Sequence, residues 1–390
     1  MSRRAQMEMA KTSAGDLEVR AETFVSAARL EPLWRELEAR SSRSFFLSWT
    51  WIGAWLETCG TNPVILAVYC QDRRVGLGLL VRGSRRQLGF RRPTLFLHET
   101  GEPAKDVAMI EDNGFLAERG FEKAVTRAAL RHAYRADGAE IVMGGVPDWL
   151  TDEAREAGWR DRVIITRPCP YRVLDPSDSD DLAQLSRNTR SQISRSLRLY
   201  ESRGNLAITP SATLGEAHDR LAAMADLHQQ RWVAAGQPGA FALPIFAEFH
   251  QRVLTRGFAT GVADVLRITA GADEIGYLYN FYCDNEVYAY QNGFQYAADQ
   301  RLKPGLVSHL LAFAYYRRAG ATRYRFLAGD SRYKRSLSTG SYDLHWLVLE
   351  RDDWRRRAEV LARRLRARLA AARGSISATP VRLGCTGSRR

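Results

Sequence analysis

The sequence predicts an α/β fold of the α+β type, built from two similar halves whose mixed, mainly antiparallel sheets are flanked by helices. Strand-patterned and helix-patterned segments alternate along 390 residues, which is long for a single hydrophobic core. A set of strands, then a helix, then a strand occurs twice. The two helix–strand junctions, "AYRADGAEIVMGG" and "YYRRAGATRYRFLAG", share a Tyr-Arg pair, a Gly-Ala step and a final Gly.

The first half carries three helix patterns and a set of short strand patterns. We expect helices over 30–39, 44–60 and 116–138, and strands over 94–99, 139–145 and on both sides of a turn at 71–74. Gly60 and Gly138 are typical helix ends. Segment 168–180 is rich in Pro, Asp and Ser and predicts the boundary between the halves. The expected divisions are therefore 1–167, 168–350 and a basic helix and tail over 351–390.

The second half repeats this order of elements. We expect helices over 181–204, 214–235 and 305–318, and strands over 205–209, 261–269, 274–283, 286–294, 322–329 and 341–350. Tight polar turns join the three central strands into a meander.

Charge and cysteine content restrict the class of protein. The net charge is +13, but residues 351–390 hold +9 of it, so residues 1–350 carry only +4. The five cysteines show no CxxC spacing, which favours reduced thiols and a cytoplasmic location. We expect no metal site, no secretory signal and no membrane span, because neither the ligand spacings nor a sufficiently long apolar run occurs.

The start of the helix at 305–318 carries the first candidate site. "QRLKPG" places Gln300, Arg301, Lys303, Pro304, Gly305 and Leu306 around the first helical turn. Backbone N–H groups there lack intrahelical partners, and Gly305 admits a close ligand. Together with the cations, these amides predict a phosphate or pyrophosphate site. Solvated residues at an ordinary helix start are an equally open interpretation.

The loop "FLAGDSRYKRS" carries the second candidate site. Asp330, Tyr333 and Lys334 bring an acid, a phenol and an amine together where a crossover strand ends, a usual place for ligands in open sheets. Asp330 or Tyr333 could move a proton, and Lys334 could hold a substrate anion. A simple capping turn is the alternative.

These residues resemble the GNAT acyltransferase superfamily, and more narrowly its CelD-like branch, a relative of the Fem-type aminoacyltransferases that carry two GNAT-like halves. The family's Q/R-x-x-G-x-G/A loop corresponds to residues 300–305, with Lys303 in place of the first glycine. The branch's Gly-Asp-x-x-Tyr-Lys signature is matched at Gly329, Asp330, Tyr333 and Lys334. "LSRNTRSQISRS" and "HQQRW" also fit. The resemblance covers roughly 180–349 well and the first half only by element order.

The resemblance implies an N-acyltransferase with a bulged central strand that makes room for a donor thioester. The implied co-substrate, which is not tightly bound, is acyl-CoA or an acyl-carrier protein, and the acceptor is an amine or hydroxyl of a small metabolite, sugar or natural product. From the residues, we expect the acceptor near Tyr279, Tyr290, Asn292, His228, Arg231 and Trp232, although such side chains often only pack in a sheet or helix face.

Two other functions stay open at this point. A Fem-like enzyme would take its acyl group from aminoacyl-tRNA, which the replaced glycine and the basic segments at 187–198 and 351–390 favour. A non-catalytic binding protein on the same fold is the third possibility.

Overall fold

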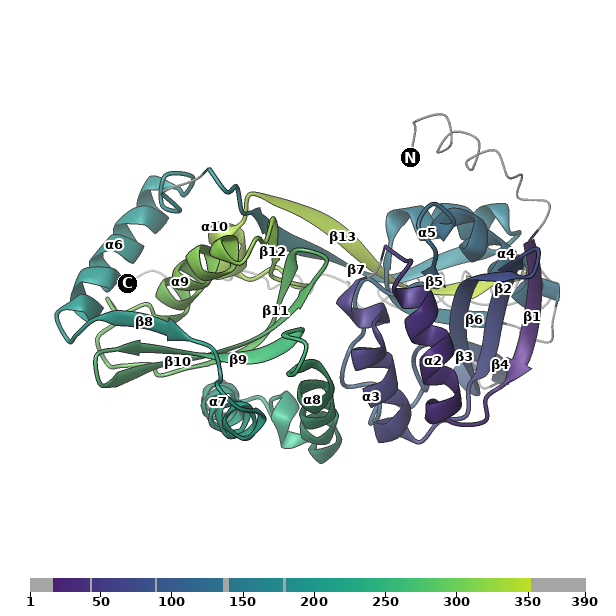
Figure 1. The fold of residues 1–390 in the computed structure, drawn as a ribbon, viewed down its shortest axis with the longest axis horizontal. Coiled ribbons are helices and arrows are strands. Elements are labelled where there is room, and N and C mark those ends of the chain that lie inside the picture. The colour runs from purple at the N-terminus through teal and green to yellow at the C-terminus, as the bar shows by residue number, and fades with distance from the viewer. Residues whose placement is uncertain (1–16, 43, 88–89, 136–139, 178–179, 352–390) are drawn as a thin grey trace, which may run out of the picture.

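The computed structural model describes residues 17–42, 44–87, 90–135, 140–177 and 180–351. Two lobes lie side by side, each a sheet with helices packed on it (Figure 1). The N-terminal lobe contains β1 (Leu17–Thr23), α2 (Ala27–Glu38), η1 (Phe45–Leu47), α3 (Trp49–Cys59), β2 (Val64–Cys70), β3 (Arg73–Gln87), β4 (Phe90–Leu97), β5 (Leu116–Ala117), α4 (Glu122–Arg135), β6 (Glu140–Pro147) and α5 (Asp148–Glu156).

The C-terminal lobe contains the meander and crossover that the sequence predicts. Its elements are α6 (Arg187–Glu201), β8 (Leu206–Thr209), α7 (Leu214–Ala234), η2 (Ala240–Ala242), α8 (Pro244–Gly257), β9 (Ala263–Ala270), β10 (Asp273–Cys283), β11 (Glu286–Phe294), α9 (Pro304–Arg318), β12 (Arg323–Arg325) and α10 (Arg332–Leu337). Two long strands, β7 (Arg160–Val173) and β13 (Gly340–Glu350), run between the lobes (Figure 1).

The lobes share one sheet because they exchange strands. Within the described ranges its order is β1-β2-β3-β4-β6-β13-β7-β12-β11-β10-β9-β8. Strand β6 of the first lobe pairs with β13, which follows the second lobe in the sequence, and Glu140 lies opposite Glu350. In the second lobe β12 pairs with β7, Arg323 opposite Val173. Each lobe therefore takes a neighbouring strand from the other, so the halves cannot separate without breaking backbone hydrogen bonds.

A hydrophobic core also crosses between the lobes. Phe45 stacks on Phe281 of β10 with ring centroids 3.9 Å apart, and Trp51 of α3 meets Phe249 of α8 edge to face at 4.7 Å. In the C-terminal lobe, α7 and α8 cover one face of the sheet, and this cluster lies beneath them. A separate cluster lies on the opposite face, which α6 and α9 cover (Figure 1). The sheet of the second lobe is therefore packed on both faces.

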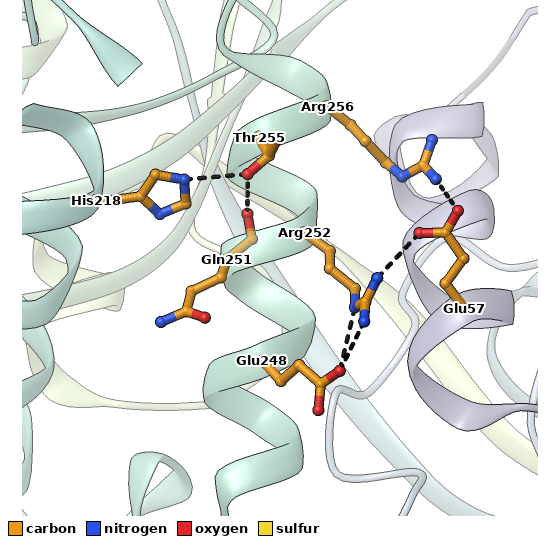
Figure 2. Close-up of a pocket in the computed structure, with 7 residues that line it drawn as sticks. All are labelled: Glu57, His218, Glu248, Gln251, Arg252, Thr255 and Arg256. Atoms are coloured by element: carbon orange, nitrogen blue, oxygen red, sulfur yellow. Dashed lines mark hydrogen bonds and ion pairs between the residues drawn. The ribbon is translucent and has the colours of Figure 1, made fainter. Parts of the chain in front are cut away.

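Charged side chains tie the lobes together where α3 meets α8 (Figure 2). Glu57 of α3 pairs with Arg256 and, at 3.3 Å, with Arg252, which also pairs with Glu248 at 2.8 Å. The side chains line an open groove of about 660 Å³. Two carboxylates balance two guanidinium groups there, so the groove carries no net charge for a ligand to meet.

Most predicted elements are confirmed, and some boundaries differ. Gly60 ends α3 in the left-handed conformation, as predicted. Helix α4 begins at Glu122 rather than 116, because Leu116 and Ala117 pair with β3. Helix α6 begins at Arg187 rather than 181, where the Ser186 hydroxyl accepts the Thr189 N–H.

Other parts of the chain were not predicted from the sequence. Residues 168–173 of the expected boundary belong to β7, and α10 forms within the expected loop at 326–336. The sequence analysis also did not predict β1, α5 and α8. No helix within the described ranges is long and apolar enough to cross a membrane. The expected basic helix and tail lie outside those ranges, apart from Arg351.

Candidate functional site

The candidate site lies where β11 and β12 separate. The two strands pair in parallel only between Glu286–Tyr288 and Arg323–Arg325. Beyond that point the chain turns toward β7, where the Phe326 N–H donates to Pro170 O (2.9 Å) and the Gly329 N–H to Pro168 O (3.0 Å). Strand β11 continues without β12 to Phe294. Pro168 and Pro170 lack N–H groups, yet their carbonyls anchor the diverging chain.

Strand β11 is bulged at the same place. Tyr279 of β10 pairs with Gln291, whereas the next residue, Asn280, pairs with Ala289, so Tyr290 is an extra residue in β11. A bulge re-aims side chains and interrupts regular pairing. Among the described residues, no strand pairs with residues 289–294 on the β12 side. That edge can therefore hydrogen-bond to an extended, amide-containing ligand.

The start of α9 is the predicted phosphate site. The Val307 N–H donates to Lys303 O at 3.1 Å, and Pro304 has no N–H, so the Gly305 and Leu306 amides are the ones without an intrahelical acceptor. The Lys303 N–H donates to the Ser196 hydroxyl of α6 at 2.9 Å. A Cβ on Gly305 would lie 3.1 Å from the Phe294 ring. This helix start is tightly packed and presents few free donors.

The preceding loop neutralises one of its own cations. The Arg301 guanidinium pairs with Asp299 at 2.8 Å, and this hydrogen-bonded pairing lowers the pKa of Asp299 to about 2. Gln300 is exposed and Leu302 is buried. Lys303 therefore supplies the cationic side chain of the loop that no described carboxylate pairs with.

Tyr333 on α10 faces the α9 side of the sheet. Its ring stacks on His309 of α9, with centroids 5.6 Å apart and planes 12° apart. Burial raises the pKa of Tyr333 to about 12, and the neighbouring Asn292 side chain opposes part of this shift. The fold thus brings together two of the predicted site residues, one from β11 and one from α10. A phenol with this pKa stays protonated at neutral pH and can donate a proton.

Lys334, the next residue, fixes the chain just beyond β12. Its Nζ donates to Leu327 O at 3.1 Å and to Ala328 O at 2.9 Å. Burial lowers the pKa of Lys334, against an attraction to Glu111 that raises it. Leu327 is buried with φ +61°, an unusual conformation for a residue with a side chain. Asp330 is exposed instead and pairs with Arg335 at 2.6 Å.

Two residues from the N-terminal lobe reach this site, and the sequence analysis missed both. Glu111 is 6% exposed and accepts the Ala328 N–H at 2.7 Å. Burial raises the pKa of Glu111 to about 7. Asp112 pairs with Arg325 of β12 at 2.9 Å and accepts the Tyr342 hydroxyl at 3.0 Å. Nothing in "IEDNG" distinguishes these acids from those of an ordinary polar turn.

The same segment closes the equivalent position in the N-terminal lobe. There β4 and β6 pair in parallel over Thr94–Phe96 and Glu140–Val142 and then separate. Asn113 bridges the two strand ends, its side chain donating to Leu97 O (3.1 Å) and its N–H to Gly145 O (2.9 Å). A Cβ on Gly145 would lie 2.3 Å from Ile110 O. The segment Ile110–Asn113 therefore lies between the separated ends of β4 and β6.

The predicted acceptor residues divide into core and surface positions. Tyr279 is fully buried, and its hydroxyl lies 3.5 Å from His250 O. Tyr290 is half-buried beside the same histidine, with ring centroids 4.7 Å apart. Tyr279 is consequently a core residue, whereas Tyr290 sits at the bulge.

The remaining three predicted residues lie near the C-terminal end of α7. The Trp232 indole N–H donates to His228 Nε2 at 2.8 Å, and burial lowers the pKa of His228. The Arg231 guanidinium lies 5.0 Å from the Tyr296 ring centroid. Trp232 and Tyr296 are both exposed, at 44% and 58%. These side chains thus gather just beyond the end of β11.

Known proteins match this chain in part of its sequence and in its fold. The model of an acetyltransferase (GNAT) domain matches residues 187–335. No curated protein matches the chain by sequence. Among solved structures, FemX is 12% identical with a TM-score of 0.57, covering 85% of this chain and 96% of its own. A conserved protein of unknown function from Bacteroides thetaiotaomicron is 11% identical, with a TM-score of 0.54 and coverage of 85% and 100%.

A third solved structure has the same overall fold. The C-terminal domain of a candidate lysylphosphatidylglycerol synthetase from Agrobacterium fabrum is 10% identical, with a TM-score of 0.51 and coverage of 84% and 93%. At these identities the likeness to solved structures concerns the fold alone.

Proposed function

Because residues 187–335 match an acetyltransferase (GNAT) domain and the chain has a fold like that of FemX, we propose that it is an acyltransferase whose reaction centre lies where β11 and β12 separate. The observation that carries the proposal is the bulged, unpaired edge of β11 beside a buried, protonated Tyr333. A donor lying along that edge would have its carbonyl held by backbone N–H groups. Orientation and proton transfer would supply the rest of the catalysis.

In the proposed reaction an acyl thioester, on coenzyme A or an acyl-carrier protein, gives its acyl group to an amine or hydroxyl. The Gly305 and Leu306 amides, with Lys303 and Gln300, would hold donor phosphate. Tyr333 would protonate the leaving group. Lys334 would keep the Leu327–Ala328 turn in place, because both carbonyls accept hydrogen bonds from its ammonium group. His228, Arg231 and Trp232 would border the acceptor.

A Fem-like reaction, with aminoacyl-tRNA as donor, is the second candidate. Two observations favour it. The amides of Arg301 and Lys303 are already bonded to protein groups, and the Arg301 side chain is paired, which weakens a pyrophosphate site. The exposed face of α6 carries four arginines without an ion-pair partner among the described residues, namely Arg187, Arg190, Arg195 and Arg198. Such a face suits a phosphodiester backbone.

A thermal-shift titration with acetyl-CoA, longer acyl-CoA, acyl-loaded carrier protein and aminoacyl-tRNA separates these donors. A ligand at about 100 times its Kd stabilises the folded state by about 2.7 kcal/mol. Gly305→Trp should abolish the response, because Gly305 already lies against Phe294. Gly215→Trp is the matched control, since Gly215 is also the second residue of a helix but is exposed.

Each outcome has a defined meaning. A response to a thioester that Gly305→Trp removes supports the first candidate, and a response to aminoacyl-tRNA alone supports the second. No response to any of the four donors would contradict the proposal and leave a binding protein on this fold.

A further inference from the structure

The N-terminal lobe reaches the reaction centre of the other lobe through one carboxylate. Glu111 contacts the second lobe at the residue where the chain leaves β12, through the 2.7 Å bond from the Ala328 N–H. The Ala328 carbonyl also accepts a hydrogen bond from Lys334 Nζ at 2.9 Å. The Leu327–Ala328 segment thus positions a carboxylate and an ammonium group where the chain has left β12 and β11 continues without it.

The chain neighbours of Glu111 and Tyr333 itself pack in different hydrophobic clusters. Ile110 beside Glu111 and Leu327 beside Ala328 belong to the cluster that α7 and α8 cover, against which Tyr290 also packs. Tyr333 packs with the cluster on the α9 face. A donor held along β11 between them would meet a proton donor on one side and a carboxylate on the other. Transfer needs this pair, since the leaving group gains a proton and the nucleophile loses one.

We propose that Glu111 binds the acceptor amine and takes its proton, so that the two lobes form one composite reaction centre. The inference rests on the proposed function. Glu111 removes one proton from the ammonium form of the acceptor, and the freed electron pair attacks the donor carbonyl carbon. As the C–N bond forms and the bond to the leaving sulfur or oxygen breaks, the nitrogen's second proton passes through the Tyr333 hydroxyl to the leaving atom. Glu111 then releases its proton to water.

Several ionisable groups surround Glu111 and set its behaviour. They are Lys334 of α10, Arg167 and Cys169 of β7, Tyr290 of β11, Tyr342 of β13 and Asp112 on its own segment. Lys334 and Arg167 favour the carboxylate form, whereas Asp112 and, most strongly, burial oppose it. Burial prevails and raises the pKa of Glu111 to about 7, which suits a group that accepts and releases a proton near neutral pH.

The test is the pH profile of kcat/KM for amine transfer by Glu111→Gln and by the wild-type chain, using the donor that binds in the thermal-shift titration. The wild type should show a rising limb with a midpoint near pH 7. Glu111→Gln should lose about 10²-fold or more of kcat/KM. The residual rate of the variant should rise tenfold per pH unit, because without Glu111 the rate is proportional to the fraction of acceptor amine that is unprotonated. The amide oxygen can still accept the Ala328 N–H, so the variant should fold and bind donor as before.

Glu57→Gln is the matched control, because it makes the same change in the same lobe at the α3–α8 groove, which Glu111 does not line (Figure 2). It should retain the wild-type profile. Full activity in Glu111→Gln, or a wild-type profile without the rising limb, would overturn the role of Glu111 while leaving the transferase proposal intact. If Glu111→Gln fails to fold, the presence or absence of the rising limb in the wild-type pH profile decides whether Glu111 has this role. Absence of transfer by the wild type with every donor would instead defeat the proposed function.

Discussion

Replacing Lys334 with methionine removes a buried ammonium group that holds the turn after β12. The Leu327 and Ala328 carbonyls would lose donors at 3.1 and 2.9 Å. A buried acceptor left without a partner costs about 1–3 kcal/mol, and the left-handed conformation of Leu327 stores about 1–2 kcal/mol that the turn must withstand. Burial lowers the pKa of Lys334 because it disfavours the charged form. Methionine carries no charge, so the variant avoids this cost of burial. We expect a net loss of about 2 kcal/mol in the free energy of unfolding at pH 7.

Urea unfolding of both proteins measures this difference, with a lower midpoint and an unchanged slope expected for Lys334→Met. The pH dependence gives a second check. Since the folded-state pKa lies below the unfolded value, the unfolded chain binds more protons in the interval between the two. Wild-type stability relative to the variant should therefore rise as pH increases through that interval. Equal midpoints at pH 7, or a difference that shrinks as pH rises, would refute the reasoning.

Three further predictions concern other parts of the site and the lobe contact. Asp112→Asn should lower the free energy of unfolding by about 2 kcal/mol, because it removes one of the two carboxylates that pair with the largely buried Arg325, Asp112 at 2.9 Å and Glu286 at 2.5 Å. Asp330→Asn should change the free energy of unfolding by less than about 1 kcal/mol, because the Asp330–Arg335 pair is exposed. Urea unfolding that ranks the two variants the other way would contradict this. Tyr333→Phe should lower kcat about 10²-fold or more while keeping the stack on His309 and the melting temperature, and an unchanged kcat would exclude Tyr333 as the proton donor. Glu57→Gln should lower the free energy of unfolding by about 1 kcal/mol at low salt and by less at 1 M NaCl, because the charge cluster is partly exposed and salt screens it. Urea unfolding that gives the same loss at both salt concentrations would argue against an electrostatic role.

Local signals in the sequence predicted the elements of the second lobe well. Pro304 and Gly305 mark the start of α9, and polar turns delimit the three strands of the meander. By contrast, "TRYRFLAG" was expected to be strand throughout, whereas β12 comprises only Arg323–Arg325. The reason is tertiary, since the Phe326 and Gly329 N–H groups bond to carbonyls of β7. The separation from β11 that forms the site is therefore not visible in the local pattern.

The composition of the site depended even more on long-range contacts. Glu111 and Ala328 are 217 residues apart in the sequence. Helix and strand periodicity relates only residues that are a few positions apart, so it cannot predict this contact. The exchange of β7 and β13 between the lobes brings them together. Tyr333 was predicted from a motif, and its partner Asn292 was predicted separately as an acceptor residue. Only the fold brings these two side chains close enough for Asn292 to influence the pKa of Tyr333.

The proposed enzyme has one reaction centre per chain, in the C-terminal lobe. Calorimetric titration of the wild-type chain with the donor that stabilises it measures the number of sites directly. We predict one donor bound per chain, with binding lost in Gly305→Trp and retained in Gly215→Trp. Two donors per chain would show that Ile110–Asn113 does not close the first lobe. A single donor that still binds Gly305→Trp would place the site away from β11 and α9.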